Sequence, residues 1–146
     1  MLALACDHGG FELMQAVKSF LDANGVSYKD FGTFSAERCD YPEKAVLAGS
    51  AIADGSCDRG IFICSTGVGI SIAANKIPGI RAALCTDCYM AEMTRRHNDA
   101  NVLALGGHIT GAVLAQRIVE VFLGTGFEAG GRHSHRVKLL CDLDEK

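Results

Sequence analysis

Short, continuous apolar runs alternate with longer amphipathic segments along this chain, and no other feature constrains its fold as much. We predict five strands, at residues 2–6, 26–31, 60–64, 80–85 and 101–105. We predict a helix after each strand, near residues 10–24, 41–54, 67–76, 87–96 and 110–123. Continuous apolar strands joined by single helices form a parallel sheet that is covered on both faces. The predicted fold class is therefore α/β, with ligands bound beyond the carboxyl ends of the strands.

A single domain over residues 1–146 accommodates this pattern, because the sequence contains no linker, low-complexity segment or repeat. A chain of this length buries about two-thirds of the surface that its unfolded form exposes. The composition, 49% hydrophobic and 21% charged, is typical of a globular protein. The charged residues from about 134 onward predict a C-terminal helical tail.

Charge and hydropathy argue against several classes of partner. The net charge is −3 and no Lys/Arg cluster exceeds a pair such as Arg95-Arg96, which argues against nucleic acid and membrane surfaces. No apolar run approaches the roughly 20 residues of a membrane helix, and the first residues lack the basic region of a signal peptide. Seven cysteines, an odd number, fit reduced thiols better than a disulfide framework. We therefore expect a cytoplasmic protein with a small-molecule ligand.

Polar residues gather beside the predicted strands. Three segments follow strands and one precedes the last strand: Cys6-Asp7-His8-Gly9-Gly10, Cys64-Ser65-Thr66-Gly67, Cys85-Thr86-Asp87 and His97-Asn98. We expect these segments to converge on one cleft. Asp7 also fits a helix cap, and His8 also fits a turn residue. His97 and Asn98 also fit a helix C-terminus.

The stretch STGVGIS, residues 65–71, predicts backbone N–H groups at a helix N-terminus, which bind phosphate, carboxylate or a developing oxyanion. It is not a P-loop, because no Gly-Lys-Ser/Thr follows, and Ile72 stands where a dinucleotide-binding motif needs its third glycine. A dinucleotide fold is the rival interpretation, with Asp87 as the ribose-binding acid. Against it, the glycine turn follows the third predicted strand, and 146 residues leave no room for a substrate domain.

Cys64 lies at a strand end just before this turn, where the helix dipole and oriented amides favour a thiolate. It is therefore a candidate base or nucleophile, and a buried strand cysteine is the structural alternative. Cys85 and Cys88 form one CxxC motif, but a zinc site needs two further ligands at suitable spacing and none is evident. We predict no metal site.

Five segments that span nearly the whole chain carry a family resemblance: CDHGG, DYPEKA, GIFICSTGVGISIAANKIPGIRAAL, RRHNDANVLALGG and GGRHSHR. Together and in this order they resemble the ribose-5-phosphate isomerase B family, which also includes galactose-6-phosphate isomerase subunits. The resemblance implies a Rossmann-like three-layer αβα sandwich and a cofactor-free aldose–ketose isomerase of sugar phosphates. It also implies a homodimer or a dimer of dimers, with sites at the subunit interface.

The resemblance assigns roles to residues of this chain. Cys64, with Thr66 beside it, is implied as the base that moves a proton between C2 and C1 of the sugar. Asp7 and His97 are implied as the pair that opens the furanose ring. The residues implied to bind the phosphate, the sugar oxygens or the enediolate are His8, Tyr41, Ser65, Gly67, Val68, Gly69, Ser71, Asn98, His108, Arg132 and Arg136. In this set His8 and the two arginines match phosphate ligands, and the amides from Gly67 to Ser71 match an oxyanion hole.

Two positions depart from the family pattern. Ser65 stands where the family commonly has glycine, and His108 stands where an arginine usually reaches the phosphate. Both departures bear on the choice of sugar, so ribose 5-phosphate, allose 6-phosphate and galactose 6-phosphate remain open as substrates. The second hypothesis is a catalytically silent subunit that binds a sugar phosphate. The presence of both Cys64 and His97 argues against it.

Overall fold

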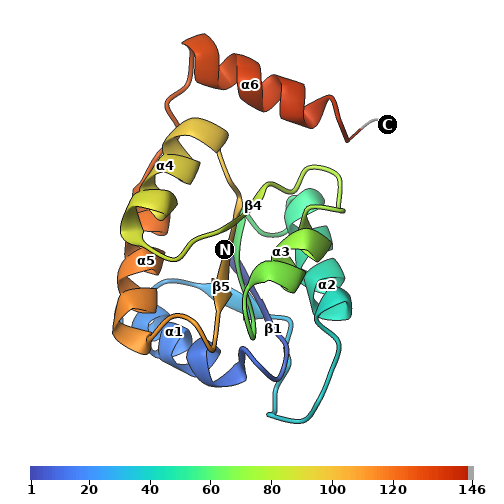
Figure 1. The fold of residues 1–146 in the computed structure, drawn as a ribbon, viewed down its shortest axis with the longest axis vertical. Coiled ribbons are helices and arrows are strands. Elements are labelled where there is room, and N and C mark those ends of the chain that lie inside the picture. Colours follow the sequence, from blue (N-terminus) through green and yellow to red (C-terminus); the bar gives the residue numbers. More distant parts are fainter. Residues whose placement is uncertain (145–146) are drawn as a thin grey trace.

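The computed structural model describes residues 1–144 as a parallel sheet between two layers of helices (Figure 1). The strands are β1 (Leu2–Cys6), β2 (Tyr28–Asp30), β3 (Arg59–Cys64), β4 (Ala82–Leu84) and β5 (Val102–Gly106). The helices are α1 (Phe11–Ala23), α2 (Tyr41–Ala53), α3 (Val68–Ala74), α4 (Cys88–Asn98), α5 (Ala112–Gly124) and α6 (Gly131–Cys141). The predicted α/β class with five parallel strands is confirmed. The last two residues of the predicted domain and tail, 145–146, lie outside the described residues.

The order of the strands creates a crevice at one edge of the sheet. The order is β2-β1-β3-β5-β4, and all neighbouring strands are parallel. Right-handed crossovers then put α1 and α4 on one face and α2 and α3 on the other. The chain leaves β1 toward one side of the sheet and leaves β3 toward the other, so their connections diverge. Such a switch point opens a binding crevice at the carboxyl ends of the two strands.

Alternating side chains divide the core into two layers. Leu4 of β1 and Ile63 of β3 pack with α1 and α5, whereas Phe62 and Cys64 of β3 pack with α2 and α3. Full burial of one such aliphatic or aromatic side chain contributes roughly 1.5–3 kcal/mol. This alternation also places the Cys64 side chain on the face that carries α3.

The predicted boundaries differ from the observed ones mainly at the sheet edges and at helix ends. The strands β2 and β4 are shorter than predicted, because each is an edge strand that pairs on one side only. The helix α4 continues to Asn98, two residues beyond its predicted end, and Asp99 then closes it in a left-handed conformation. Among residues 1–144, no helix is both long and apolar enough to cross a membrane.

Helix α6 stands apart from the sheet. It packs against α4, at the end of the molecule away from the loops that follow β1 and β3 (Figure 1). None of its residues is buried, and Leu139 and Leu140 are 51% and 42% exposed. The helix therefore presents apolar side chains that its own chain does not cover.

Candidate active site

A cavity of about 570 Å³ opens at the switch point between β1 and β3. Its walls come from the loops after β1, β2 and β3 and from the first turns of α2 and α3: Asp7, His8, Arg38, Cys39, Asp40, Tyr41, Cys64, Ser65, Thr66, Val68, Gly69 and Ile72. We call this cavity the thiol pocket. It brings together eight of the site residues predicted from the sequence.

The thiol of Cys64 is held by the glycine turn that follows it. The side chain is 4% exposed, and its Sγ accepts a hydrogen bond from the Gly67 N–H at 3.2 Å. Gly67 has φ +78°, and a Cβ at this position would lie 2.5 Å from Cδ1 of Leu84 and 2.8 Å from the carbonyl carbon of Leu105. Only glycine fits both this conformation and this space. The sulfur therefore lies in the pocket wall, next to an amide donor.

Some N–H groups of the glycine turn after Cys64 already donate hydrogen bonds within the chain. The Val68 N–H donates to Thr66 Oγ1 at 3.2 Å, and the Ser71 hydroxyl donates to the Val68 carbonyl at 2.8 Å. Ser71 does not line the thiol pocket. Within residues 1–144, the N–H groups of Gly69 and Ile70 have no hydrogen-bond partner. The predicted set of amide donors thus narrows to these two groups.

Asp7 and His8 form the opposite wall. The carboxylate of Asp7 is 5% exposed, and its Oδ1 accepts the Gly10 N–H at 3.1 Å, so it stabilises the turn before α1 as well as lining the pocket. The Nδ1 atom of His8 lies 3.2 Å from the carbonyl oxygen of Cys39 and 3.3 Å from its nitrogen. The Nε2 atom of His8 makes no hydrogen bond with any described residue, so it remains available to a ligand.

Ser65 and Tyr41 each lie against a glycine. A Cβ on Gly9 would lie 2.0 Å from the Ser65 Oγ, so the hydroxymethyl group of Ser65 occupies the space above Gly9. A Cβ on Gly69 would lie 2.6 Å from Cζ of Tyr41, so the tyrosine ring covers the start of α3. The serine that departs from the family pattern is therefore accommodated, and it lines the pocket.

The sequence analysis missed Arg38, Cys39 and Asp40, which lie on the loop after β2 and line the thiol pocket. Strand β2 pairs with β1 in parallel, so the two strands end at the same edge of the sheet. That neighbourhood is the signal that could have identified this loop. Arg38 is exposed and forms no ion pair within residues 1–144. It supplies the pocket with a cation.

Four predicted site residues lie at the opposite edge. Helix α4 begins after β4 and runs back along its 11 residues, about 16 Å, to the amino edge of the sheet, where His97 and Asn98 end it. Arg132 and Arg136 lie on α6, which packs at this same end. The expectation that His97 and Asn98 converge with Cys64 is therefore wrong for a single chain, because they precede strand β5 and do not follow it.

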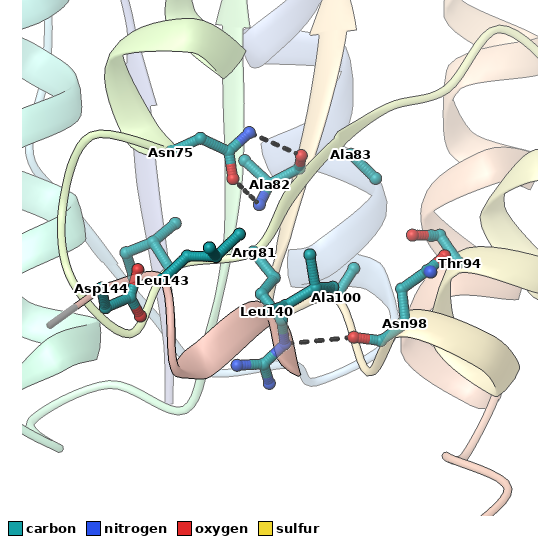
Figure 2. Close-up of a pocket in the computed structure, with 11 residues that line it drawn as sticks. Asn75, Arg81, Ala82, Ala83, Thr94, Asn98, Ala100, Leu140, Leu143 and Asp144 are labelled. Carbon is teal, nitrogen blue, oxygen red and sulfur yellow. Dashed lines mark hydrogen bonds between the residues drawn. The ribbon is translucent and has the colours of Figure 1, made fainter. Parts of the chain in front are cut away.

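A second cavity, of about 410 Å³, lies at this amino edge (Figure 2). It is lined by Asn98 and by residues of β4 and of the C-terminal segment, including Leu140 and Asp144. Arg81 donates to the Asn98 carbonyl at 3.1 Å. The guanidinium of Arg81 is thus committed to fixing the end of α4.

His97 stacks on His133 of α6, with ring centroids 4.1 Å apart and planes 5° from parallel. The Nε2 atom of His133 lies 4.0 Å from a carboxylate oxygen of Glu128, which is paired with Arg96. Burial, followed by the charges of His97 and Arg132, holds the pKa of His133 below its usual value.

These rings and Glu128 form a possible metal-ligand set. The ligand atoms of His97, Glu128 and His133 lie within 4.8 Å of one another, the only such group in the described part of the chain. The carboxylate is already paired with Arg96, however, and Arg132 adds positive charge nearby. This electrostatic environment suits an anion better than a divalent cation.

Other predicted positions are explained by local structure. The His108 N–H donates to the Ser65 carbonyl at 2.9 Å, so His108 lies at the edge that carries the thiol pocket, but its exposed side chain does not line the cavity. Asp87 accepts a hydrogen bond from the Met90 N–H at 2.8 Å and so caps α4. This capping role explains the acidic residue that the dinucleotide interpretation assigned to ribose binding. Burial raises the pKa of Cys85 to about 12.

Comparison with known proteins agrees with this architecture. The family model described as Ribose/Galactose Isomerase matches residues 2–140. The chain is 48% identical to ribose-5-phosphate isomerase B of Escherichia coli, over 99% of this chain and 97% of the relative. It is 35% identical to a galactose-6-phosphate isomerase subunit of Clostridium acetobutylicum, over 99% and 84% of the two chains. A solved ribose-5-phosphate isomerase B of Clostridium thermocellum superimposes with a TM-score of 0.96 at 49% identity, covering 99% of this chain and 97% of that one.

Proposed function

This chain belongs to the ribose/galactose isomerase family, and on that premise we propose that it converts ribose 5-phosphate into ribulose 5-phosphate. The observation that carries this proposal is the thiol pocket. It brings together a cysteine sulfur, a buried carboxylate and two backbone amides that pair with no described residue, at the switch point of a parallel sheet. These are the groups that proton transfer next to a sugar carbonyl requires.

In the proposed reaction the Cys64 thiolate removes the proton from C2 of the open-chain aldose. The electron pair forms the C1–C2 double bond of a cis-enediolate, and the negative charge develops on O1. The N–H groups of Gly69 and Ile70 are the donors that hold this charge. Return of the proton to C1, with transfer of the O2 proton to O1, gives the ketose. Thr66, next to the thiol, contacts the same part of the sugar.

Ring opening and phosphate binding are proposed to need a second copy of the chain. Asp7 lies in the thiol pocket, but its proposed partner His97 lies at the far edge of the sheet, with Asn98, Arg132 and Arg136. A homodimer that seats the His97 end of one chain over the thiol pocket of the other completes the set. The uncovered leucines of α6 support an interface at that end. Pairing of such dimers into tetramers is compatible with this arrangement.

In the completed site, His8 and the two arginines of α6 bind the phosphate. Arginine suits this role because its planar donors match phosphate oxygens in pairs. Asn98 orients sugar oxygens, and Tyr41 with Ser65 bounds the sugar. All seven cysteines are free thiols, which supports placing this metabolic enzyme in the cytoplasm.

The test compares Cys64→Ala with Cys88→Ala, a matched cysteine outside the thiol pocket. We expect Cys64→Ala to lower kcat for ribose 5-phosphate by about 10²–10⁴-fold, because a general base contributes this much. Binding of a non-isomerising sugar phosphate should stay nearly unchanged, and Cys88→Ala should retain wild-type turnover. A Cys64→Ala enzyme with more than about a tenth of wild-type turnover would refute the assigned base.

A six-carbon substrate is the second candidate, favoured by the departures at Ser65 and His108 and by the galactose-6-phosphate isomerase relative. The same assay with allose 6-phosphate and galactose 6-phosphate decides between the sugars by kcat/KM. Binding of all three phosphates without turnover of any would instead favour a silent binding subunit.

A further inference from the structure

His133 lies face to face with His97, to which the proposed function gives ring opening. Within residues 1–144 no hydrogen bond holds the His97 ring, and its described partner is the parallel ring of His133 at 4.1 Å. We propose that His133 is a positioning residue: its ring fixes the plane in which the His97 imidazole meets the furanose oxygen of the substrate. This inference rests on the proposed function and adds a residue to it.

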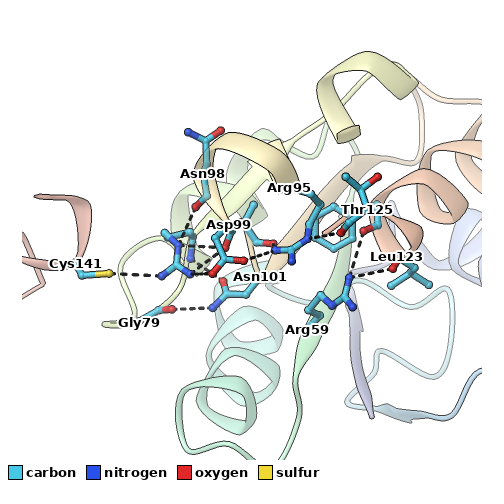
Figure 3. Close-up of polar contacts among 12 residues, drawn as sticks. Arg59, Gly79, Arg95, Asn98, Asp99, Asn101, Leu123, Thr125 and Cys141 are labelled. Carbon is cyan, nitrogen blue, oxygen red and sulfur yellow. Dashed lines mark hydrogen bonds and ion pairs between the residues drawn. The ribbon is translucent and has the colours of Figure 1, made fainter. Parts of the chain in front are cut away.

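The backbone beneath His97 is fixed, but its side chain is not. The carboxylate of Asp99, a residue with φ 45°, accepts hydrogen bonds from the guanidinium groups of Arg95 at 2.8 Å and Arg81 at 3.3 Å. Arg95 also donates to the Ala100 carbonyl at 2.6 Å (Figure 3). This network ends α4 in one defined conformation. A ring on the last turn of a helix still rotates about its side-chain torsions unless something packs against it. The stack with His133 supplies that packing.

His133 is itself anchored to α4. The Glu128 N–H donates to the Arg96 carbonyl at 3.0 Å, and the carboxylate of Glu128 pairs with the Arg96 guanidinium. These two contacts hold the segment before α6 beside His97. The first turn of α6, which carries His133, therefore packs on the His97 ring. The His133 side chain is accordingly only 12% exposed.

The environment of His133 disfavours protonation of its ring. The charged groups around His133 are His97 of α4, Glu128 of the preceding loop, which is paired with Arg96, and two arginines of α6, Arg132 and Arg136. Burial first, and then the positive charges of His97 and Arg132, lower the pKa of His133, which Glu128 opposes. The lowered pKa favours the neutral form of the His133 ring and so reduces like-charge repulsion within the stack.

The experiment uses three variants of the full chain. His133→Ala removes the stacked ring, and His133→Phe keeps a planar ring that cannot be protonated. His135→Ala is the control, at an exposed histidine of the same helix. Each is assayed with ribose 5-phosphate, which must be opened, and with erythrose 4-phosphate, whose phosphorylated O4 cannot close a furanose. Exchange of the C2 proton with solvent is the readout for the second probe.

We expect His133→Ala to lower kcat for ribose 5-phosphate by about 10–100-fold, because a small misplacement of a reacting group has this effect. KM and the exchange of erythrose 4-phosphate should change by less than about threefold, and His133→Phe should recover most of the lost kcat. His135→Ala should match the wild type. Equal losses on both substrates, or no loss on either, would overturn the positioning role, as would failure of phenylalanine to rescue a folded enzyme.

Two measurements separate this inference from the proposed function. If His97→Asn does not impair ribose 5-phosphate selectively, the ring-opening assignment of His97 itself fails. If it does and His133→Ala does not, only the inference fails. Independently of activity, NMR titration of the His133 ring should give a pKa below 6.5 in the wild type that rises in His97→Asn, because one source of positive charge is removed. An unchanged His133 titration in that variant would contradict the described stack.

Discussion

The N–H of Gly67 donates to the sulfur of Cys64 across 3.2 Å, so the left-handed turn and the proposed base form one unit. The amide is available to the sulfur because Gly67 adopts φ +78° before α3 begins. A residue that pulled the turn out of this conformation would move the donor as well as the start of the helix. The hydrogen bond to the Cys64 sulfur therefore depends on the backbone conformation of Gly67.

Gly67→Ala tests this dependence. We expect the free energy of unfolding to fall by about 2 kcal/mol or more, because a Cβ is disfavoured at positive φ and meets Leu84 and Leu105 at under 3 Å. Urea denaturation measures the change. Gly126→Ala is the matched control, since nothing lies within 4 Å of a Cβ there, and it should stay within about 0.5 kcal/mol of the wild type. Equal stabilities of the two variants would contradict the described turn.

Alkylation separates the cysteines by environment. Burial raises the pKa of Cys6 and Cys85 to about 12, so at pH 8 both remain thiols and should resist iodoacetamide in the folded protein. Cys64 opens on the thiol pocket and should be alkylated, and ribose 5-phosphate should slow its labelling. The exposed Cys141 should react with or without the sugar.

Peptide mapping after limiting reagent gives the order of labelling. Earlier labelling of Cys85 than of Cys64 would contradict the assigned environments. A rate at Cys64 that does not respond to ribose 5-phosphate would place the substrate elsewhere.

His108→Arg tests the remaining departure from the family pattern. His108 follows β5 at the edge that carries the thiol pocket, and its backbone is bonded to Ser65. If this position faces the phosphate, a guanidinium should lower KM for ribose 5-phosphate by about threefold to tenfold, because it pairs with phosphate oxygens through two donors. Inhibition by unphosphorylated ribose is the control and should not change. An unchanged KM would mean that the side chain points to solvent.

The sequence sufficed for the fold because its signals are local. Leu4, Ile63 and Leu105 lie in continuous apolar runs, and these runs predicted the central strands. The edge strands were predicted too long, since an apolar run does not reveal how many neighbours a strand has. Arg38 was missed because its position in the pocket depends on the pairing of β2 with β1, a relation distant in sequence.

The site was predictable only where its residues follow strands. Asp7 and Cys64 end two central strands, and the parallel sheet brings their loops together. The sequence analysis groups His97 with these residues, although His97 precedes a strand. A residue that precedes a parallel strand lies at the opposite edge of the sheet from residues that follow one. The stack of His97 on His133 left no sequence signal, because it depends on how α6 meets α4.

We propose that one functional site combines the thiol pocket of one chain with the His97 end of another. Mixing inactive Cys64→Ala with inactive His97→Asn tests it most directly, after subunit exchange is demonstrated with differently tagged chains. Random pairing into dimers leaves one intact site in each mixed dimer, so activity should recover to about a quarter of the wild-type value per chain. No recovery despite proven exchange would place Cys64 and His97 in the same chain's site and rule out a site shared between two chains.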